Sequence, residues 1–309
     1  MSTLLLSHPA CLDHITPEGH PERSDRLRAV AKALAEPRFD ALVRELAPEG
    51  NLDHVALCHD NHYIDELRHF APADGMAFID GDTSMSPGTW EAVMRGVGGA
   101  LAATDAVMQG KASNAFVATR PPGHHAEINK AMGFCFFDNA AIAARYAQRT
   151  YGITRAAVVD FDVHHGNGTQ EIFWADKSVM YCSTHEMPLF PGTGAIGERG
   201  EFDTVVNAPL ASGDGSVKFR AAFDNLILPQ LQAFSPELII LSAGFDAHRR
   251  DPLATLNLDA ADFGWVTRKL MDIANASAGG RIVSVLEGGY DLQGLQESVA
   301  AHVDALMHG

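Results

Sequence analysis

Short apolar runs alternate along this chain with longer segments of helical periodicity, and this alternation limits the fold more than any other feature. Strands that alternate with helices are typical of a mostly parallel sheet with helices on both faces. We predict one α/β domain over residues 1–309, because no linker or internal repeat divides the chain. The expected strands are 3–7, 114–119, 156–160, 178–183, 237–242 and 281–287, and the expected helices are 24–35, 89–109, 138–150, 216–233, 259–276 and 294–307.

Polar, glycine-rich segments follow five of these strands. In chain order they read RPPGHHAE, FDVHHGNG, THEMPLFPGTG, AGFDAHRRDPL and GGYDL. In open parallel sheets, ligands bind outside the carboxyl ends of the strands, where loops from several strands meet. The sequence therefore predicts one composite site at this edge of the sheet.

Asp160, Asp162 and His164 stand at alternate positions directly after an apolar run. In an extended chain, alternate side chains lie on one face, so two carboxylates and an imidazole converge. Zn²⁺ accepts both ligand types, and a catalytic zinc needs only three protein ligands if one position stays open. Asp246 follows another apolar run and can supply a remaining ligand. The predicted set of ligands is Asp162, His164 and Asp246, although alternation alone does not distinguish Asp160 from the other two residues of its triplet.

His124 and His125 follow a stiff Pro-Pro-Gly segment, and imidazole titrates near neutral pH. One of them is a candidate base that accepts a proton from water, with the other as an electrostatic support. Tyr290 follows a Gly-Gly pair, and its hydroxyl is a candidate donor to a developing oxyanion. Together with the metal site, these groups indicate a hydrolase.

Charge and cysteine content exclude several classes of protein. The chain has 23 Lys and Arg against 39 Asp and Glu, a formal charge of −16. Such a surface repels phosphate backbones, so we expect no direct nucleic-acid partner, and it attracts cationic ligands. The four cysteines form no C-x-x-C pair, which favours reduced, buried thiols. No apolar run has the length of a signal-peptide core or a membrane span, so we expect a cytoplasmic protein without membrane contact.

Several long motifs occur in a fixed order: RPPGHHA, GFCFFDNAAIAA, VVDFDVHHGNGTQEIF, LFPGTG, SAGFDAHRRDPL and LEGGYDL. In these motifs the chain resembles the zinc-dependent histone deacetylase family, within the arginase and deacetylase fold. The PEGHPER segment and Asn167 are more similar to class II enzymes and their bacterial relatives. The resemblance implies a single-domain, three-layer α/β/α architecture with a mostly parallel central sheet of about eight strands.

The resemblance also implies a reaction and a catalytic set. The reaction is removal of an acetyl or other short acyl group from the side-chain amine of acyl-lysine in a protein or peptide, with release of acetate. The three predicted ligands would bind one zinc ion per chain. His125 would be the general base and then the general acid, and Tyr290 would polarise the substrate carbonyl.

The two adjacent histidines are expected to differ in their partners. The resemblance implies that His124 is an electrostatic partner hydrogen-bonded to Asp160. Asn167 stands behind His125, where class I enzymes carry an Asp. A neutral amide raises the pKa of His125 less than a carboxylate would, whereas Asp160 favours a charged His124. These unequal partners divide two imidazoles into two roles.

Substrate contacts are implied in the same way. Phe134 and Phe190 would wall a narrow tunnel, beside Gly133, that holds the methylenes of an acyl-lysine. Asp82 is near the position of a group that binds the substrate backbone, and Asp80 is close by. Arg23 matches an arginine near an internal acetate pocket.

Potassium is a second cofactor that the resemblance implies. The backbone carbonyls of Asp160, Asp162, His164 and Thr184, with the Ser183 hydroxyl, match one potassium site. Carbonyls near Phe173 and Val179 match a second site, although Asp176 between them departs from the usual residue.

Three other readings remain open. A binuclear manganese hydrolase of the arginase type would need carboxylates where this chain has Gly166 and His248. An acetylpolyamine amidohydrolase would act on a small cationic acetylated amine. Such enzymes place a Glu at the pocket mouth, and the corresponding residue is Leu253, which favours acyl-lysine. A catalytically silent acyl-lysine binding module would have no need to keep every catalytic group. The sequence leaves the oligomeric state open.

Overall fold

The computed structural model describes residues 2–309 of the chain. Over these residues, eight strands form one parallel sheet in the order β2-β1-β5-β10-β9-β6-β7-β8. The strands are β1 (Thr3–Ser7), β2 (Val43–Leu46), β5 (Asn114–Val117), β6 (Ala156–Asp160), β7 (Val179–Glu186), β8 (Val205–Leu210), β9 (Leu238–Ala243) and β10 (Ile282–Leu286). A separate antiparallel pair consists of β3 (Ala77–Phe78) and β4 (Ser84–Met85). The predicted architecture is confirmed.

All six predicted strands form, with ends that differ by a few residues. The two strands that sequence reasoning missed, β2 and β8, lie at the two edges of the sheet. The side chains of β2 are all exposed, and β8 contains Asn207 and Pro209. Neither edge strand therefore has the continuous apolar run by which a doubly covered strand is detected.

The helices are α1 (Asp25–Ala33), α2 (Leu52–Val55), α3 (Asn61–Phe70), α4 (Thr89–Met108), α5 (Asn139–Tyr151), α6 (Asn167–Phe173), α7 (Ser216–Ala222), α8 (Leu228–Phe234), α9 (Ala260–Ser277) and α10 (Leu292–His308). The six predicted helical segments are confirmed, while α2, α3 and α6 were not predicted. The predicted helix 216–233 is divided by a wider π turn at Phe223–Ile227. Pro229 lies two residues beyond that turn and has no backbone N–H to donate, which favours the interruption.

Local chemistry fixes the ends of the helix that follows the histidine tandem. The Asp138 side chain accepts a hydrogen bond from the backbone N–H of Ala141 at 2.8 Å and caps the start of α5. Gly152 ends the same helix in the left-handed conformation, with φ of 68°. These signals agree with the bounds expected from the sequence.

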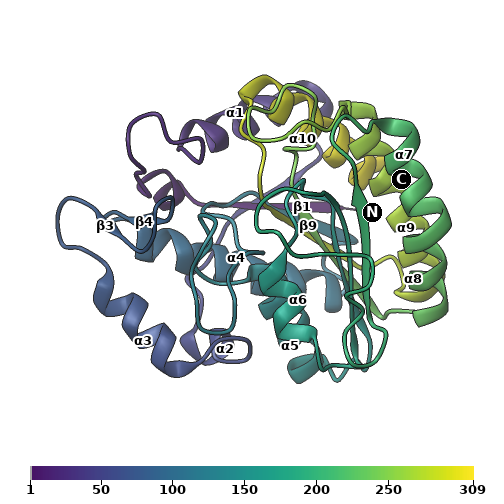
Figure 1. Cartoon of the computed structure of the whole chain (residues 1–309), viewed down its shortest axis with the longest axis horizontal. Helices are drawn as coiled ribbons and strands as arrows, with labels where there is room; N and C mark the ends of the chain where they lie inside the picture. Colours follow the sequence, from purple (N-terminus) through teal and green to yellow (C-terminus); the bar gives the residue numbers. More distant parts are fainter. Residues whose placement is uncertain (1) are drawn as a thin grey trace.

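Two layers of helices cover the sheet, as Figure 1 shows, with α7, α8 and α9 on one side and α3 projecting on the other. Alternate residues of each strand face the two layers. In β6, Ala157 and Val159 pack in the core shared with α1, α9 and α10. Ala156 and Val158 pack in the core shared with α3, α4 and α5. Because both faces are covered, the strands read as continuous apolar runs.

Over residues 2–309, no helix combines the length and the apolar character needed to cross a membrane. All four cysteines are free and buried, as expected.

Candidate active site

The carboxyl ends of β5, β10, β9 and β6 lie side by side, because these four strands are consecutive neighbours in the sheet. Asp160 is the last residue of β6 and pairs with Ser242 of β9. The segments that follow carry the predicted residues: the histidine tandem after β5, Tyr290 after β10, Asp246 after β9, and Asp162 and His164 after β6. The composite site expected from the sequence therefore forms at the carboxyl ends of these central strands.

Asp162, His164 and Asp246 are buried and bring one ligand atom each to within 4.8 Å of the others. His164 Nδ1 lies 3.2 Å from Asp162 Oδ1 and 3.2 Å from Asp246 Oδ2. Backbone N–H groups hold the carboxylates in place. Asp162 Oδ2 accepts from Gly288 at 2.8 Å, and Asp246 Oδ1 accepts from Val163 at 2.8 Å.

Two glycines make room for this triad. A Cβ at Gly244 would lie 2.0 Å from Asp162 Oδ2, and one at Gly288 would lie 2.1 Å from Asp246 Oδ2. Atoms do not approach this closely, so any side chain at either position would displace a carboxylate. The glycines in LSAGFD and LEGGYD therefore leave the space that the two carboxylates occupy.

The electrostatics of the triad favour a bound cation. Burial raises the pKa of Asp246 to about 7, and the neighbouring Asp162 carboxylate adds to the shift. Burial alone would lower the pKa of His164, but hydrogen bonds to Asp162 and Asp246 raise it to about 10. Two buried carboxylates close together are stabilised by any positive charge placed between them, whether a proton on His164 or a metal ion. Two carboxylates and an imidazole are ligands suited to Zn²⁺, so the residues present fit this metal.

The two histidines of the tandem have the different partners expected from the sequence. His124 Nδ1 donates to Asp160 Oδ2 at 2.9 Å, and His125 Nδ1 donates to Asn167 Oδ1 at 2.8 Å. Burial lowers the pKa of His124, but the charges of Asp160 and Asp162 outweigh burial and raise it well above its usual value. Burial and the neighbouring charged His124 hold the pKa of His125 well below its usual value. His124 therefore holds a proton more strongly than His125 does.

A cavity of about 240 Å³ leads to these groups, lined by Asp82, His125, Gly133, Phe134, His164, Leu189, Phe190, Leu253 and Tyr290. Five of the six residues predicted to contact substrate line it. The Phe190 ring lies edge-on to His125 with centroids 5.1 Å apart. The Phe134 ring lies edge-on to Tyr290 with centroids 5.9 Å apart. The cavity is therefore an aromatic-walled tunnel that ends on ionisable groups.

Gly133 and Phe134 turn the chain sharply where it forms the tunnel wall. Both residues have positive φ, 56° for Gly133 and 68° for Phe134. A Cβ at Gly133 would lie 2.6 Å from the His125 ring, so only glycine fits. Phe134 has a left-handed backbone conformation that residues other than glycine rarely adopt, and such backbone strain concentrates at functional sites.

Asp80 and Asp82 have separate roles in the hairpin between β3 and β4. Asp80 Oδ1 accepts from the backbone N–H groups of Asp82 at 3.0 Å and Thr83 at 2.6 Å. Asp80 therefore stabilises the turn, while the exposed Asp82 lines the tunnel. The backbone N–H of Phe134 donates to Thr83 Oγ1 at 3.1 Å, which joins this turn to the tunnel wall.

The prediction that Arg23 lies near an internal pocket of the site is wrong. Arg23 is half exposed and pairs with Asp25 at 3.6 Å, because it precedes α1 on the outside of the turn. Arg26, one helical turn further on, is the buried arginine. Its Nε donates to the Gly289 carbonyl at 2.7 Å, and its guanidinium lies 4.9 Å from the Tyr290 ring centroid.

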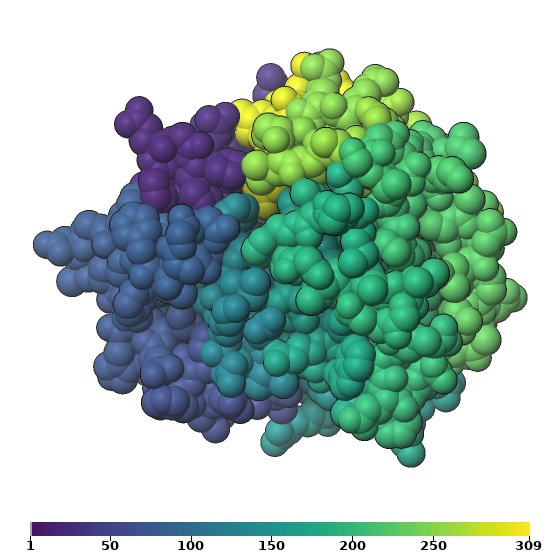
Figure 2. All heavy atoms as spheres, viewed as in Figure 1, coloured from purple at the N-terminus to yellow at the C-terminus, as the bar shows by residue number. Residues whose placement is uncertain are grey.

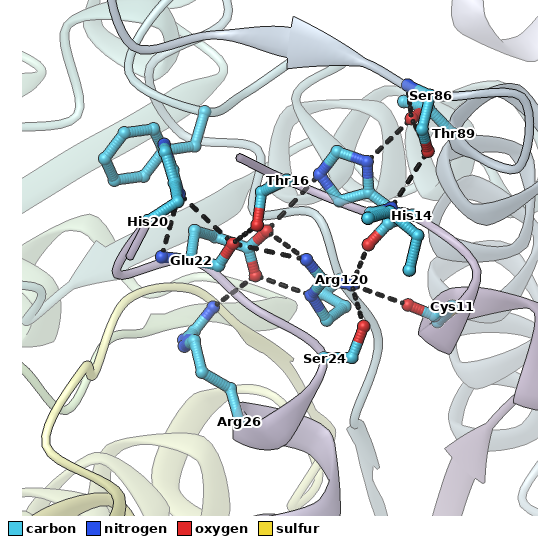
Figure 3. A network of polar contacts seen from close by, with 12 residues as sticks. Cys11, His14, Thr16, His20, Glu22, Ser24, Arg26, Ser86, Thr89 and Arg120 are labelled. Atoms are coloured by element: carbon cyan, nitrogen blue, oxygen red, sulfur yellow. Dashed lines mark hydrogen bonds and ion pairs between the residues drawn. The ribbon is translucent and has the colours of Figure 1, made fainter. Parts of the chain in front are cut away.

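Arg26 belongs to a buried ionic network around Glu22 (Figure 3). Arg120 donates to both carboxylate oxygens of Glu22, at 2.7 and 2.6 Å, and Arg26 donates to Oε1 at 3.1 Å. His14 Nε2 lies 3.3 Å from Oε2. Burial raises the pKa of Glu22, but Arg120 and His14 outweigh burial and hold it well below its usual value. The network fixes the N-terminal segment, which Figure 2 shows in purple between the blue segment and the yellow-green C-terminal part.

Three further polar residues of the site were missed by sequence reasoning. Asp251 Oδ2 accepts from the backbone N–H of Tyr290 at 2.7 Å. Glu287 Oε2 accepts from the backbone N–H groups of Gly123 at 2.7 Å and His124 at 3.2 Å. The Tyr181 hydroxyl donates to Asp160 Oδ2 at 3.1 Å. The polar positions within DPL and LEGGYD were the available signal for Asp251 and Glu287, whereas Tyr181 lies inside a strand and gave none.

The residues expected around potassium are all buried, from Asp160 to His164 and at Phe173, Val179, Ser183 and Thr184. The Ser183 hydroxyl lies 2.8 Å from His185 Nδ1, and His185 Nε2 lies 2.8 Å from the Gly194 carbonyl. Burial lowers the pKa of His185 to about 4, so the imidazole is neutral. Binding of potassium at either place stays a prediction.

Two carboxylates and an imidazole that could hold a metal ion, a pair of adjacent histidines and a tunnel meet at the strand ends of a parallel sheet, and such a candidate active site is suited to hydrolysis. Comparison with known proteins also indicates a hydrolase. A sequence profile described as the histone deacetylase domain matches residues 20–306. The chain belongs to the histone deacetylase family, whose members are zinc-dependent hydrolases acting on amides.

Relatives and a solved structure resemble the chain over nearly its whole length. Histone deacetylase 10, chloroplastic, of Oryza sativa subsp. japonica is 38% identical over 304 residues, covering 92% of this chain and 68% of the relative. The histone deacetylase-like amidohydrolase of Pseudomonas aeruginosa is 38% identical over 277 residues, covering 88% and 73%. The crystal structure of the HDA15 HD domain matches with a TM-score of 0.94 at 36% identity, covering 99% of this chain and 89% of that one.

Proposed function

We propose that residues 1–309 form a single zinc-dependent deacetylase domain that removes acetyl or other short acyl groups from lysine side chains in proteins or peptides. The observation that carries this proposal is the tunnel of about 240 Å³, walled by Phe134 and Phe190 and ending on His125 and Tyr290. Apolar methylenes fit such a wall, and burying them favours binding. Relatives named histone deacetylases and probable deacetylases support the same class of reaction.

Asp162, His164 and Asp246 would hold the zinc ion, and zinc in such a site lowers the pKa of water and polarises carbonyl groups. The remaining chemistry comes from the side chains around the tunnel end. The Nδ1–H of His125 is used by Asn167, so Nε2 is the nitrogen free to accept a proton from the attacking water. The same nitrogen then returns the proton to the lysine amine as the C–N bond breaks.

Tyr290 supplies the hydrogen bond to the substrate carbonyl oxygen as negative charge develops there. Burial holds the pKa of Tyr290 well above its usual value, against the opposing effect of Arg26. The phenol is therefore protonated at neutral pH and can donate. The nearby His124 remains charged through Asp160 and supports the negative charge of the reacting centre by electrostatics.

The mouth of the tunnel supports acyl-lysine in preference to an N-acetylated polyamine. Leu253 offers no carboxylate to a distal ammonium, while Asp82 is exposed at the rim and can accept backbone N–H groups of a peptide. The cytoplasmic location and the potassium ions expected from the sequence stay predictions, and two plant relatives are named chloroplastic.

Acetate release from an acetyl-lysine peptide by zinc-loaded protein tests this function. Wild-type protein should release acetate and free lysine in equal amounts, and His125→Ala should lower the rate by about 100-fold or more. Tight peptide binding without acetate release would instead indicate a binding module.

A further inference from the structure

A chain of two hydrogen bonds leads from the tunnel to the opposite side of the histidine tandem. His125 Nδ1 is bonded to Asn167 Oδ1 at 2.8 Å, and Asn167 Nδ2 donates to Glu127 Oε1 at 2.7 Å. Asn167 is the first residue of α6, and Glu127 lies two residues after His125 in the loop that follows β5. Glu127 thus reaches the imidazole only through the amide.

In the row of hydrogen bonds from Glu127 through Asn167 to His125, the donor or acceptor role of each group fixes the role of the next. An ionised carboxylate accepts hydrogen bonds and cannot donate them, so Glu127 requires the NH₂ group of Asn167 to face it. The amide oxygen of Asn167 must then face His125 Nδ1, which can satisfy it only as an N–H donor. A neutral imidazole protonated at Nδ1 carries its lone pair at Nε2, the nitrogen on the tunnel side.

The reversed amide would be unfavourable at both ends. Its oxygen would face the Glu127 carboxylate, and its NH₂ group would face His125 Nδ1. Two further contacts of Asn167 Nδ2, with the His125 carbonyl at 3.5 Å and Met132 Sδ at 3.4 Å, are also with acceptors. Every neighbour of that nitrogen therefore supports one orientation.

Glu127 is open to solvent on the side away from the tunnel. It is partly exposed and lines a pocket of about 600 Å³ with Asn167, Trp174 and Arg145, on the side of Asn167 away from the tunnel. Asn167 is 7% exposed, so a reversed amide could not exchange its lost hydrogen bonds freely for water.

We propose that Glu127 is a positioning residue that fixes the tautomer of His125 through the amide of Asn167. The inference rests on the proposed role of His125 as the general base. A carboxylate outside the tunnel, which touches neither substrate nor metal ligand, then decides whether Nε2 can accept a proton.

Substitutions that change the donor and acceptor character at position 127, with a control for the change in charge, test this proposal. Glu127→Gln keeps an acceptor and should retain near wild-type kcat. Glu127→Lys offers only donors, favours the reversed amide, and should lower kcat by about 100-fold with little change in KM, as loss of general-base catalysis would. Glu45→Lys, on the exposed edge strand β2, changes the net charge equally and should leave kcat unchanged.

Nitrogen NMR of isotope-labelled histidine reads the tautomer directly. His125 should carry its proton on Nδ1 in wild type and Glu127→Gln, and on Nε2 in Glu127→Lys. In an Asn167→Ala background, Glu127→Lys should cause no further loss of kcat. Zinc content and thermal unfolding identify a variant that has merely lost its structure.

The outcomes separate the inference from the proposed function. If His125→Ala is inactive while Glu127→Lys keeps both its rate and the Nδ1–H tautomer, the role of Glu127 is overturned and that of His125 stands. If His125→Ala keeps full activity, the assignment of the base fails whatever the tautomer. A full loss from Glu127→Lys in the Asn167→Ala background would also overturn the inference, because the effect would not pass through the amide.

Discussion

The Asp251 carboxylate accepts a hydrogen bond from the backbone N–H of Tyr290 at 2.7 Å, and it also accepts one from the backbone N–H of Leu253 at 3.0 Å. The buried Asp251 side chain therefore joins Leu253, at the mouth of the tunnel, to Tyr290, whose phenol lies at the inner end of the tunnel. Asp251 is 8% exposed, so these N–H groups have little access to water as a substitute.

Asp251→Asn should loosen the loop that carries the phenol. An amide retains one acceptor oxygen and places an NH₂ group against one of the backbone N–H groups, which should destabilise the fold by about 1–3 kcal/mol. We expect kcat to fall, and the loss to be smaller in a Tyr290→Phe background, because both changes act on the same hydrogen bond to substrate. Additive losses in this double-mutant cycle would contradict a link between the two residues.

Tyr290→Phe should lower kcat by about 100-fold, the effect of removing one oxyanion donor. Zinc content should not change, because Tyr290 is not one of the three residues whose ligand atoms cluster. Steady-state kinetics with an acetyl-lysine peptide measures the loss. An unchanged kcat would remove Tyr290 from the mechanism.

Asp246→Ala should reduce bound zinc well below one ion per chain, since it removes one of three ligands. Asp160→Asn provides the matched control, because the Asp160 side chain bonds His124 and the backbone N–H of Asp162 but supplies none of the three clustered ligand atoms. That variant should retain its zinc and still lose activity, as His124 loses its charged partner. Elemental analysis of the purified variants distinguishes the two aspartates, and equal zinc loss in both would contradict the assignment.

Leu253→Glu should shift the preference of the enzyme toward acetylated polyamines. A carboxylate at the tunnel mouth would pair with the distal ammonium, and an exposed pair of this kind is worth about 1 kcal/mol, or about fivefold in kcat/KM. Leu253→Gln has a similar size and no charge, so it should leave the ratio of the two substrates near the wild-type value. Equal ratios for the Glu and Gln variants would exclude this electrostatic effect.

Glu287 should make stability depend on pH. Burial raises its pKa from 4.5 to about 8, so the native state keeps a proton that the unfolded chain releases between those values. The resulting stability is fully present below about pH 4.5 and is lost as the pH rises through 8. Glu287→Gln keeps the acceptor for Gly123 and His124 and should remove this slope. Denaturant unfolding of both proteins between these pH values measures the difference, and parallel curves would contradict it.

The sequence was sufficient for those parts of the fold and site that depend on local pattern. Apolar runs identified the strands covered on both faces, and the alternation of Asp160, Asp162 and His164 put three side chains on one face. Their actual division, with Asp160 bonded to His124, follows from how the loops meet in space. No local pattern carries that information.

The misassignment of Arg23 has the same origin. Arg23 and Arg26 stand three residues apart in a charged segment, and the sequence does not say which of them points inward. Only the start of α1, with Glu22 and Arg120 already buried, turns Arg26 toward Gly289 and leaves Arg23 outside. Backbone acceptors such as Gly289 leave no trace in the amino-acid sequence.

A side-by-side rate comparison decides whether this active site prefers acyl-lysine as its substrate. Zinc-loaded wild-type protein would be assayed for kcat/KM on an acetyl-lysine peptide and on an N-acetylated polyamine, with His125→Ala as the background. We predict that wild-type protein has a higher kcat/KM for the peptide than for the acetylated polyamine. His125→Ala should release no measurable acetate from either substrate. A clearly higher kcat/KM for the acetylated polyamine would contradict the proposed substrate.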